Sequence, residues 1–262
     1  MSTADTLFSI QRHLMEEALA AGCRWRQVGR FGTLVNPRLD DPNVNHVRPL
    51  GVQPLDPWAD RASFVEACAA LAEYGRPAVV VFDPAQAPAT LPAFLTAEHF
   101  VLEAREVFMV LAGDDTGSPP ASDITVVPVG VGPQLRSYTR LWGQIFGDDL
   151  ADTWLAAIEA IFRAEIAAST TRYVCALRAG QAVGTGALKG RGRVVELVGI
   201  GTLLGARRQG VATAVVRHLV GLARAHRAEL IFLAATSQSS GERLYHRLGF
   251  RVVGEQQRWR FV

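Results

Sequence analysis

Residues 194–216 constrain the fold most, because strand and helix periodicity meet there across a turn of glycine and arginine. The stretch VVELVGIGTLL (194–204) is apolar and rich in β-branched residues, which predicts a strand. Downstream, apolar residues recur at helical spacing, at Val211, Val215, Leu219 and Leu222. GARRQG (205–210) separates the two patterns. The sequence therefore predicts a tight strand-to-helix connection in an α/β domain.

This turn has a functional and a structural interpretation. The first N–H groups of a helix are unpaired and carry partial positive charge, so they bind phosphate, and glycine lets a ligand approach the backbone closely. Arg207 and Arg208 would add charge-assisted hydrogen bonds. Alternatively, glycine serves only the turn and the arginines are solvated. The segment lacks the Gly-Lys-Ser/Thr end of a nucleoside-triphosphate loop and the three glycines of a dinucleotide fingerprint.

Charge is distributed unevenly along the 262 residues. There are 9 Lys and Arg against 15 Asp and Glu through residue 122, and 18 against 10 after it, so the C-terminal half is basic and suits an anionic ligand. A stripe of basic residues with interleaved aromatics is missing from the sequence, so we expect no nucleic-acid partner. The apolar runs are too short to span a membrane, and the polar first twenty residues predict an amphipathic helix rather than a signal peptide.

Three cysteines at irregular spacing favour a reducing compartment, so we expect a cytoplasmic protein without a metal site. Cys175 lies in the middle of a predicted strand and is interpreted as a core residue. A homodimer is compatible with this composition.

The segment GDDTGSPPAS (113–122) is the best candidate linker, and it predicts an N-terminal domain at 1–112 and a C-terminal domain at 123–262. Both parts close similarly, with a buried strand, a short helix and a segment that begins with Phe100 or Phe250. Each of these last segments is expected to be a hairpin. Aligning them indicates a degenerate tandem repeat. The N-terminal copy has no counterpart of the glycine and arginine turn, so we expect no second cofactor site there.

Two motifs in the C-terminal part carry a resemblance to a known family. The pattern Arg207-x-x-Gly210-x-Ala212 resembles the Gln/Arg-x-x-Gly-x-Gly/Ala pyrophosphate loop of the GNAT superfamily of N-acetyltransferases. ERLYHRLGF (242–250) resembles the Leu-Tyr-x-x-Leu-Gly-Phe end of that domain, and the order of predicted elements from 124 to 262 also matches. The resemblance implies an α/β fold of two GNAT-like domains, each with a mixed, mostly antiparallel sheet flanked by helices. Leu204, Ala206 and Gln238 depart from the common family residues, which affects details of cofactor contact.

The resemblance further implies acetyl-CoA as co-substrate and an amine as acceptor. Backbone amides of residues 208–213 would hold the pyrophosphate, and the strand would splay from its neighbour near 199–202 so that Ile200 and Thr202 bond the pantetheine arm and polarise the thioester. The predicted cofactor-binding residues are Ile200, Gly201, Thr202, Arg207, Arg208, Gln209, Gly210, Val211, Ala212, Thr213 and Gln238.

Transfer to an amine requires a deprotonated amine and a proton for the leaving thiolate. By family position Tyr245 is the candidate acid, with core packing as the alternative. Glu196, on the strand approaching the thioester, is the candidate base through water, with a surface carboxylate as the alternative. His218 is interpreted as structural.

The resulting expectation is an N-acyltransferase. A non-catalytic acyl-CoA-binding sensor is the alternative from another class, and a structural pseudo-enzyme is a third. The turn-forming stretch NPRLDDPNVNHV (36–47) is interpreted as turns, or as a loop that shapes the acceptor pocket.

Overall fold

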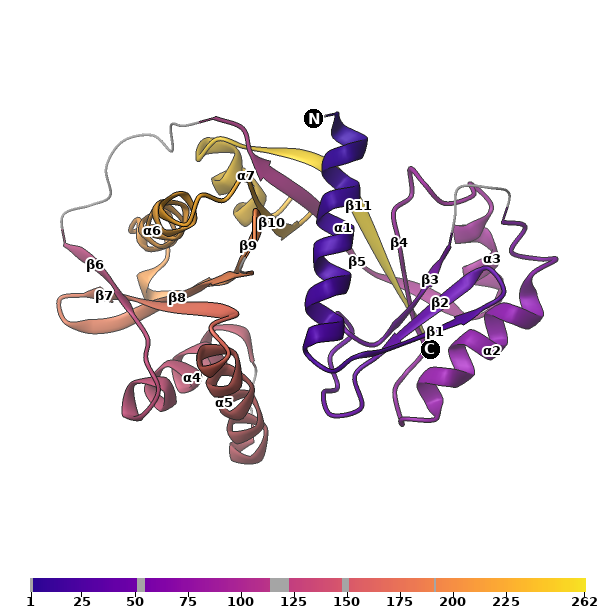
Figure 1. Ribbon diagram of the computed structural model, residues 1–262, viewed down its shortest axis with the longest axis horizontal. Coiled ribbons are helices and arrows are strands. Elements are labelled where there is room, and N and C mark those ends of the chain that lie inside the picture. The colour runs from indigo at the N-terminus through magenta and orange to yellow at the C-terminus, as the bar shows by residue number, and fades with distance from the viewer. Residues whose placement is uncertain (1, 51–54, 114–122, 148–150, 191) are drawn as a thin grey trace. The chain divides into compact units, whose positions relative to one another are not determined.

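The computed structural model describes residues 2–50, 55–113, 123–147, 151–190 and 192–262 (Figure 1). Most of the predicted linker, residues 114–122, lies outside the described residues. The helices are α1 (Thr3–Ala20), α2 (Arg61–Ala72), α3 (Leu91–Ala97), α4 (Pro133–Phe146), α5 (Asp152–Ala167), the 3₁₀ turn η1 (Leu204–Ala206), α6 (Val211–Ala225) and α7 (Ser240–Arg247). The strands are β1 (Arg24–Val28), β2 (Phe31–Val35), β3 (His46–Pro49), β4 (Val79–Phe82), β5 (Phe100–Leu111), β6 (Ile124–Pro128), β7 (Thr171–Arg178), β8 (Gln181–Lys189), β9 (Val194–Thr202), β10 (Leu230–Thr236) and β11 (Phe250–Phe261).

The chain divides into two compact units. The first unit consists of Met1–Phe108, Ala235–Glu242 and Val252–Val262, and the second of Met109–Ala234 and Arg243–Arg251. Most of β11 therefore belongs to the first unit, although in the chain it comes after the residues of the second unit.

In the first unit, β1, β2, β3, β4 and β11 are neighbours in the sheet. Pairing is antiparallel except between β3 and β4. Alternate residues face opposite sides, so Thr33 of β2 donates its hydroxyl hydrogen to the carbonyl of Ala67 in α2 (2.9 Å), whereas Leu34 packs on Ala18 of α1. The core on the α2 face is aromatic, with edge-to-face contacts of Phe64 to Phe31 and Phe94. Helices therefore cover both faces.

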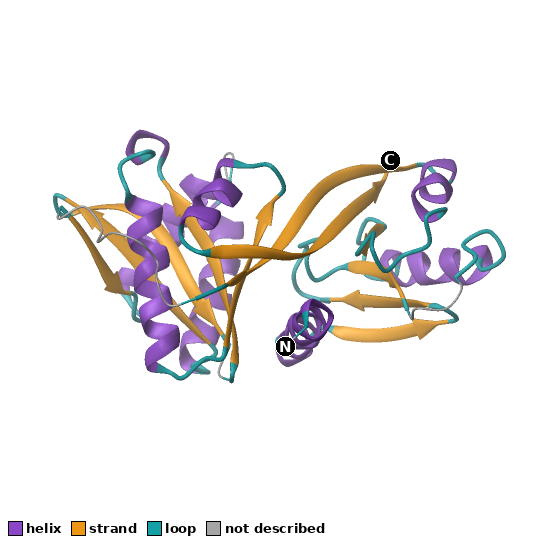
Figure 2. Ribbon diagram, turned by 90° about the horizontal axis from the view of Figure 1, so that it is seen from above, coloured by secondary structure: helices purple, strands orange, loops and turns teal. Residues whose placement is uncertain are grey.

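In the second unit, the sheet order is β10-β9-β8-β7-β6, antiparallel except between β9 and β10. Figures 1 and 2 show helices on both of its faces, with α6 on one side and α4 and α5 on the other. Two glycines of β8 allow the close approach of α6. A Cβ at Gly184 would lie 2.5 Å from Val211 Cγ1, and one at Gly186 would lie 2.4 Å from Val215 Cγ1. The predicted apolar stripe of α6 is thus confirmed as its packing face.

The mixed α/β fold is confirmed, but both predicted closing hairpins are wrong. Residues 100–111 and 250–261 each form one continuous strand. The hairpin at the C-terminus would need a turn residue, and Gly254 is the one glycine within that strand, yet it does not adopt a positive φ. A Cβ at Gly254 would lie 2.8 Å from Leu7 Cδ1, so this glycine makes room for α1.

Candidate acyl-CoA site

A bulge in β9 shapes the candidate site. The pairing of β8 with β9 shifts register between Thr185 and Ala187, and Gly199 has φ +59°. The Thr185 hydroxyl donates to the carbonyl oxygen of Gly199 (2.9 Å), which fixes the bulge. Bulges bend a strand and redirect its polar groups, and here the bend begins one residue before Ile200.

β9 then separates from β10. Their pairing runs from Val194 with Leu230 to Glu196 with Phe232, and no pairing follows in the described part of either strand. The β9 backbone from residue 197 to 202 therefore presents an edge without a strand partner on that side, and backbone groups on such an edge accept a ligand strand or an amide-bearing ligand. The Thr202 hydroxyl is buried and has no hydrogen-bond partner among the described residues.

The connection to α6 is compact. Arg207 Nε donates to the carbonyl of Thr202 (3.3 Å), so this side chain ties the turn to the end of β9. Arg208 and Gly210 have φ of +64° and +86°. Glycine adopts this left-handed conformation freely, but an arginine does so at a cost, and such strained residues cluster at functional sites.

The N-terminus of α6 is open. The first backbone hydrogen bond across the turn runs from Ala214 N to Gly210 O, so the N–H groups of Val211, Ala212 and Thr213 precede it. The described residues supply no side-chain cap and no acidic side chain in the first turn. Arg207, Arg208, Gln209 and Gly210 are all exposed. This combination of free donors, helix dipole and cations is suited to an anion such as phosphate.

Tyr245 lies in α7 and is buried, with its ring 6.1 Å from that of Phe250. Burial raises the pKa of Tyr245 to about 12, so its hydroxyl is protonated at neutral pH. No other described residue hydrogen-bonds this hydroxyl. The structure is compatible with a proton donor and with a packing residue, and the assigned role stays a prediction.

Glu196 lies within a strand, whereas Gln238 lies just before a helix. Glu196 lies partly buried in β9, opposite Lys189 of β8 and Phe232 of β10. The backbone N–H of Gln238 donates to Glu242 (2.5 Å), and Ser239 Oγ, directly before α7, accepts from the N–H of Glu242 (3.1 Å), which caps the helix. The functional roles of Glu196 and Gln238 stay predictions.

Sequence analysis missed an aromatic wall beside the bulge. A Cβ at Gly201 would lie 2.4 Å from Ile145 and 2.6 Å from Phe146, and one at Gly199 would lie 3.7 Å from Trp142 Nε1. Trp142 stacks on Trp154 of α5 (5.6 Å between ring centroids). Nothing in the sequence indicated that this face of α4 lies on the bulge, because the two are far apart in the chain.

Two further side chains of this unit, Cys175 and His218, have pKa values shifted by burial. Cys175 is buried in β7, and burial raises the pKa of its thiol. Partial burial lowers the pKa of His218. Within the described residues, no helix combines the length and apolar composition that crossing a bilayer requires.

The comparisons with known proteins agree with the geometry of this unit. Residues 136–250 match the family model "Acetyltransferase (GNAT) family". No curated protein matches the chain.

Solved structures match nearly the whole chain. A GCN5-related N-acetyltransferase from Kribbella flavida has 19% identity and a TM-score of 0.75, over 97% of this chain and 94% of its own. One from Sphaerobacter thermophilus has 14% identity and a TM-score of 0.64, over 90% and 81%. A tandem GNAT protein from the clavulanic acid biosynthesis pathway has 16% identity and a TM-score of 0.61, over 90% and 80%. The fold is thus that of tandem GNAT proteins, and residues 136–250 match the GNAT acetyltransferase family.

Proposed function

We propose that this chain is an N-acyltransferase that transfers an acetyl group from acetyl-CoA to an amine. GNAT domains in general support acyl-CoA-dependent acetyl transfer. The observation that carries the proposal is the adjacency of two open backbone features, the β9 edge after Glu196 and the N-terminus of α6 behind Gly210. A ligand with a pyrophosphate and an arm of amides satisfies both, and coenzyme A has both parts.

In this proposal the turn binds and the strand orients. The N–H groups of residues 208–213 hold the pyrophosphate, with Arg207 and Arg208 adding charge. Backbone groups of Ile200 and Thr202 bond the pantetheine arm and polarise the thioester carbonyl, which stabilises the oxyanion of the tetrahedral intermediate.

The chemistry then requires two proton movements. The amine nitrogen attacks the thioester carbon, the C–S bond breaks, and the thiolate takes a proton. Tyr245 supplies that proton, because its hydroxyl stays protonated up to about pH 12. Glu196 removes the proton of the amine through water. The aromatic wall of Trp142 and Phe146 borders the bulge, and it would exclude water from the acceptor side.

An assay for free thiol tests this proposal. Acetyl-CoA is mixed with the protein and pooled primary amines, and thiol release above the protein-free rate is expected. The variant Tyr245→Phe should bind CoA with nearly unchanged affinity and lower turnover by up to about 100- to 10,000-fold, the range typical of general acid catalysis. Tyr74→Phe, a partly buried tyrosine of the first unit, is the matched control and should leave turnover unchanged.

The alternative is a non-catalytic acyl-CoA sensor, which the burial of Tyr245 against Phe250 also fits. Tight CoA binding with no thiol release from any amine pool would favour the sensor. If Tyr245→Phe turned over as fast as the wild type, Tyr245 would be a packing residue and water or another group would protonate the sulfur.

A further inference from the structure

The first unit contains a cavity that the proposed transfer reaction does not use. Its volume is about 300 Å³, at the lower end of the range for small-molecule sites. Residues from α1, β1, β3, β4, β5 and β11 line it, together with the segments that follow β3 and β4. The apolar part of the wall includes Leu14, Met15, Trp25, Leu55, Phe82 and Phe108. Three charged side chains complete the lining, one cation and two carboxylates: Arg48, Asp83 and Glu255.

Arg48 lies in the same wall as two carboxylates, but it forms no ion pair with a carboxylate among the described residues. Its Nε is buried and has no hydrogen-bond partner among the described residues, which is also true of Arg258 Nε, but Arg258 Nε forms an ion pair with Glu103 (3.1 Å). One Nη of Arg48 lies 3.1 Å from His46 Nε2, and a guanidinium only donates, so the imidazole accepts there. His46 Nδ1 therefore carries the ring hydrogen and donates to the carbonyl of Pro42 (3.2 Å). Burial, and then the charge of Arg48, lower the pKa of His46 to about 3, so the ring is neutral and leaves the Arg48 charge uncompensated.

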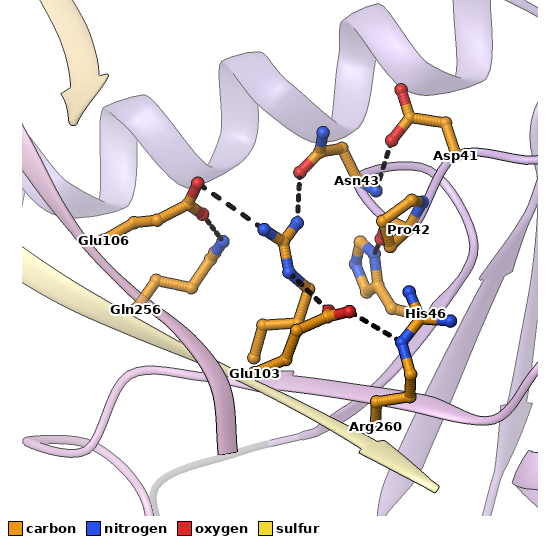
Figure 3. Close-up of polar contacts among 9 residues, drawn as sticks. Asp41, Pro42, Asn43, His46, Glu103, Glu106, Gln256 and Arg260 are labelled. Atoms are coloured by element: carbon orange, nitrogen blue, oxygen red, sulfur yellow. Dashed lines mark hydrogen bonds and ion pairs between the residues drawn. The ribbon is translucent and has the colours of Figure 1, made fainter. Parts of the chain in front are cut away.

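A second arginine of the same unit shows how such a charge is normally balanced. Arg258 donates to Asn43 Oδ1 (2.8 Å) and forms ion pairs with Glu103 (3.1 Å) and Glu106 (3.8 Å). Figure 3 labels these three partners and shows Gln256 beside Glu106, to which it donates a hydrogen bond (3.3 Å). Buried charges are generally paired in this way. Arg48 lines a cavity instead.

The two carboxylates of the cavity wall carry the opposite charge. Asp83 is partly buried and accepts hydrogen bonds from Ala85 N (2.8 Å) and Gln86 Nε2 (3.0 Å). Burial raises the pKa of Asp83 despite these bonds, and the charge of Glu255 adds to the rise. Two neighbouring carboxylates repel each other, and a bound cation relieves that repulsion.

We propose that this cavity is a binding site for a small zwitterion with an apolar body, of the class of the apolar amino acids. The ligand's carboxylate pairs with Arg48, its ammonium group lies at Asp83 and Glu255, and its side chain contacts the apolar wall. A purely anionic ligand would leave the negative charges of the two carboxylates uncompensated. A purely cationic ligand would leave the positive charge of Arg48 uncompensated. The site is separate from the acyl-CoA site and does not depend on the transfer reaction.

Calorimetric titration of the full chain at pH 7 tests the proposal with three related probes. L-Phenylalanine carries both charges, 3-phenylpropionate only the carboxylate, and phenethylamine only the ammonium group. We expect one L-phenylalanine per chain, and at least tenfold weaker binding of the other two probes. The absence of L-phenylalanine binding, or equal affinity for all three probes, would overturn the proposal.

Variants locate the bound molecule. Arg48→Gln and Asp83→Asn should each weaken L-phenylalanine binding about tenfold or more, because each removes a charge-assisted contact. Arg12→Gln is the matched control, since Arg12 is exposed on α1 and only pairs with Glu16. Unchanged affinity in a folded Arg48→Gln protein would place the amino acid elsewhere and refute the assignment. If Arg48→Gln does not fold, Asp83→Asn and the three probes on the wild type decide the matter.

Discussion

Both units pass from a strand to a helix that packs on the sheet, but the two connections differ in chemistry. In the second unit β9 ends at Thr202 and α6 begins at Val211, after Gly210 in a left-handed conformation. In the first unit β3 ends at Pro49 and α2 begins at Arg61, after Asp60 with φ −89°. Part of the latter connection, residues 51–54, lies outside the described residues.

The start of α2 is acidic where that of α6 is cationic. The carboxylate of Asp56 accepts hydrogen bonds from the N–H groups of Trp58 (3.0 Å) and Ala59 (3.4 Å). Asp60, at the helix start, forms an ion pair with Arg30 (3.7 Å). Anions are favoured at a helix N-terminus, but here two of the chain's own carboxylates lie just before the helix, without capping it, and would repel a phosphate. A duplicated fold thus preserves the helix without preserving the conditions for binding an anion, and the predictions below test that difference.

The largest effect is expected at Gly210. The variant Gly210→Glu places a negative charge and bulk against the proposed pyrophosphate. In the wild type, CoA at a hundredfold excess over its dissociation constant should stabilise the fold by about 2.7 kcal/mol, and the variant should lose this stabilisation. Thermal unfolding with and without CoA measures it.

The variant Gly210→Asn is the control for the backbone, because asparagine tolerates a positive φ and carries no charge. It should retain part of the CoA effect. Loss of the effect to the same degree in both variants would show that backbone conformation, rather than charge, decides binding. A wild type whose unfolding CoA does not shift would remove the basis of the proposed function.

The sequence was sufficient for the features of the second unit that are local. Spacing predicted α6 and the turn before it, and the family motif identified Arg207 and Gly210 as neighbours at that turn. The closing strand β11 was mispredicted because a glycine within a strand pattern suggests a turn, whereas Gly254 provides space for Leu7 of α1. That requirement comes from a helix nearly 250 residues earlier, which no local pattern records.

The cavity of the first unit was not predictable for the same reason. Met15, Arg48, Asp83 and Glu255 are far apart in the sequence, and each has an ordinary local setting. An arginine in a predicted strand does not indicate whether it will form an ion pair with a carboxylate in the folded protein. Only the assembled unit shows that Arg258 has such partners and that the described carboxylates do not pair with Arg48.

The second prediction concerns acid stability, in which the first unit has a specific weakness. His46 has a pKa of about 3 in the folded protein, below its ordinary value of 6.5. The unfolded chain therefore binds more protons between these values, and the free energy of unfolding falls as the pH falls through that window. The stability that depends on a neutral His46 is fully present above pH 6.5. At pH 5 about 2 kcal/mol of it is lost.

Denaturant unfolding at pH 7 and pH 5 measures this loss, and hydrogen exchange assigns it to a unit. In His46→Gln the difference between the two pH values should shrink by about 2 kcal/mol. His226→Gln, at an exposed histidine of the second unit, should keep the wild-type difference. Equal pH dependence in wild type and His46→Gln would contradict the prediction.

A smaller effect is expected at the arginines of the turn. Arg207→Gln removes a charge and the bond to Thr202, and it should weaken CoA binding about tenfold, as expected for a hydrogen bond to a charged group. The loss should diminish at high salt, because exposed charges are screened. Arg217→Gln, farther along α6, is the comparison variant and should change affinity by much less. Equal weakening in both would indicate a diffuse effect of basic charge.

The smallest effect, and the most direct test of the comparison, is expected at the start of α2. The double variant Asp56→Asn/Asp60→Asn removes the two carboxylates that distinguish this helix start from that of α6. Asparagine can still accept hydrogen bonds from Trp58 and Ala59, so the turn should be retained. The exposed ion pair with Arg30 contributes at most about 1 kcal/mol. CoA stoichiometry should stay at one per chain, because the described residues directly before α2, 55–60, include no glycine. If calorimetric titration gave two CoA molecules per chain, the acidic charge alone would have prevented binding at a second site. The geometry of the turn would then matter less than we infer.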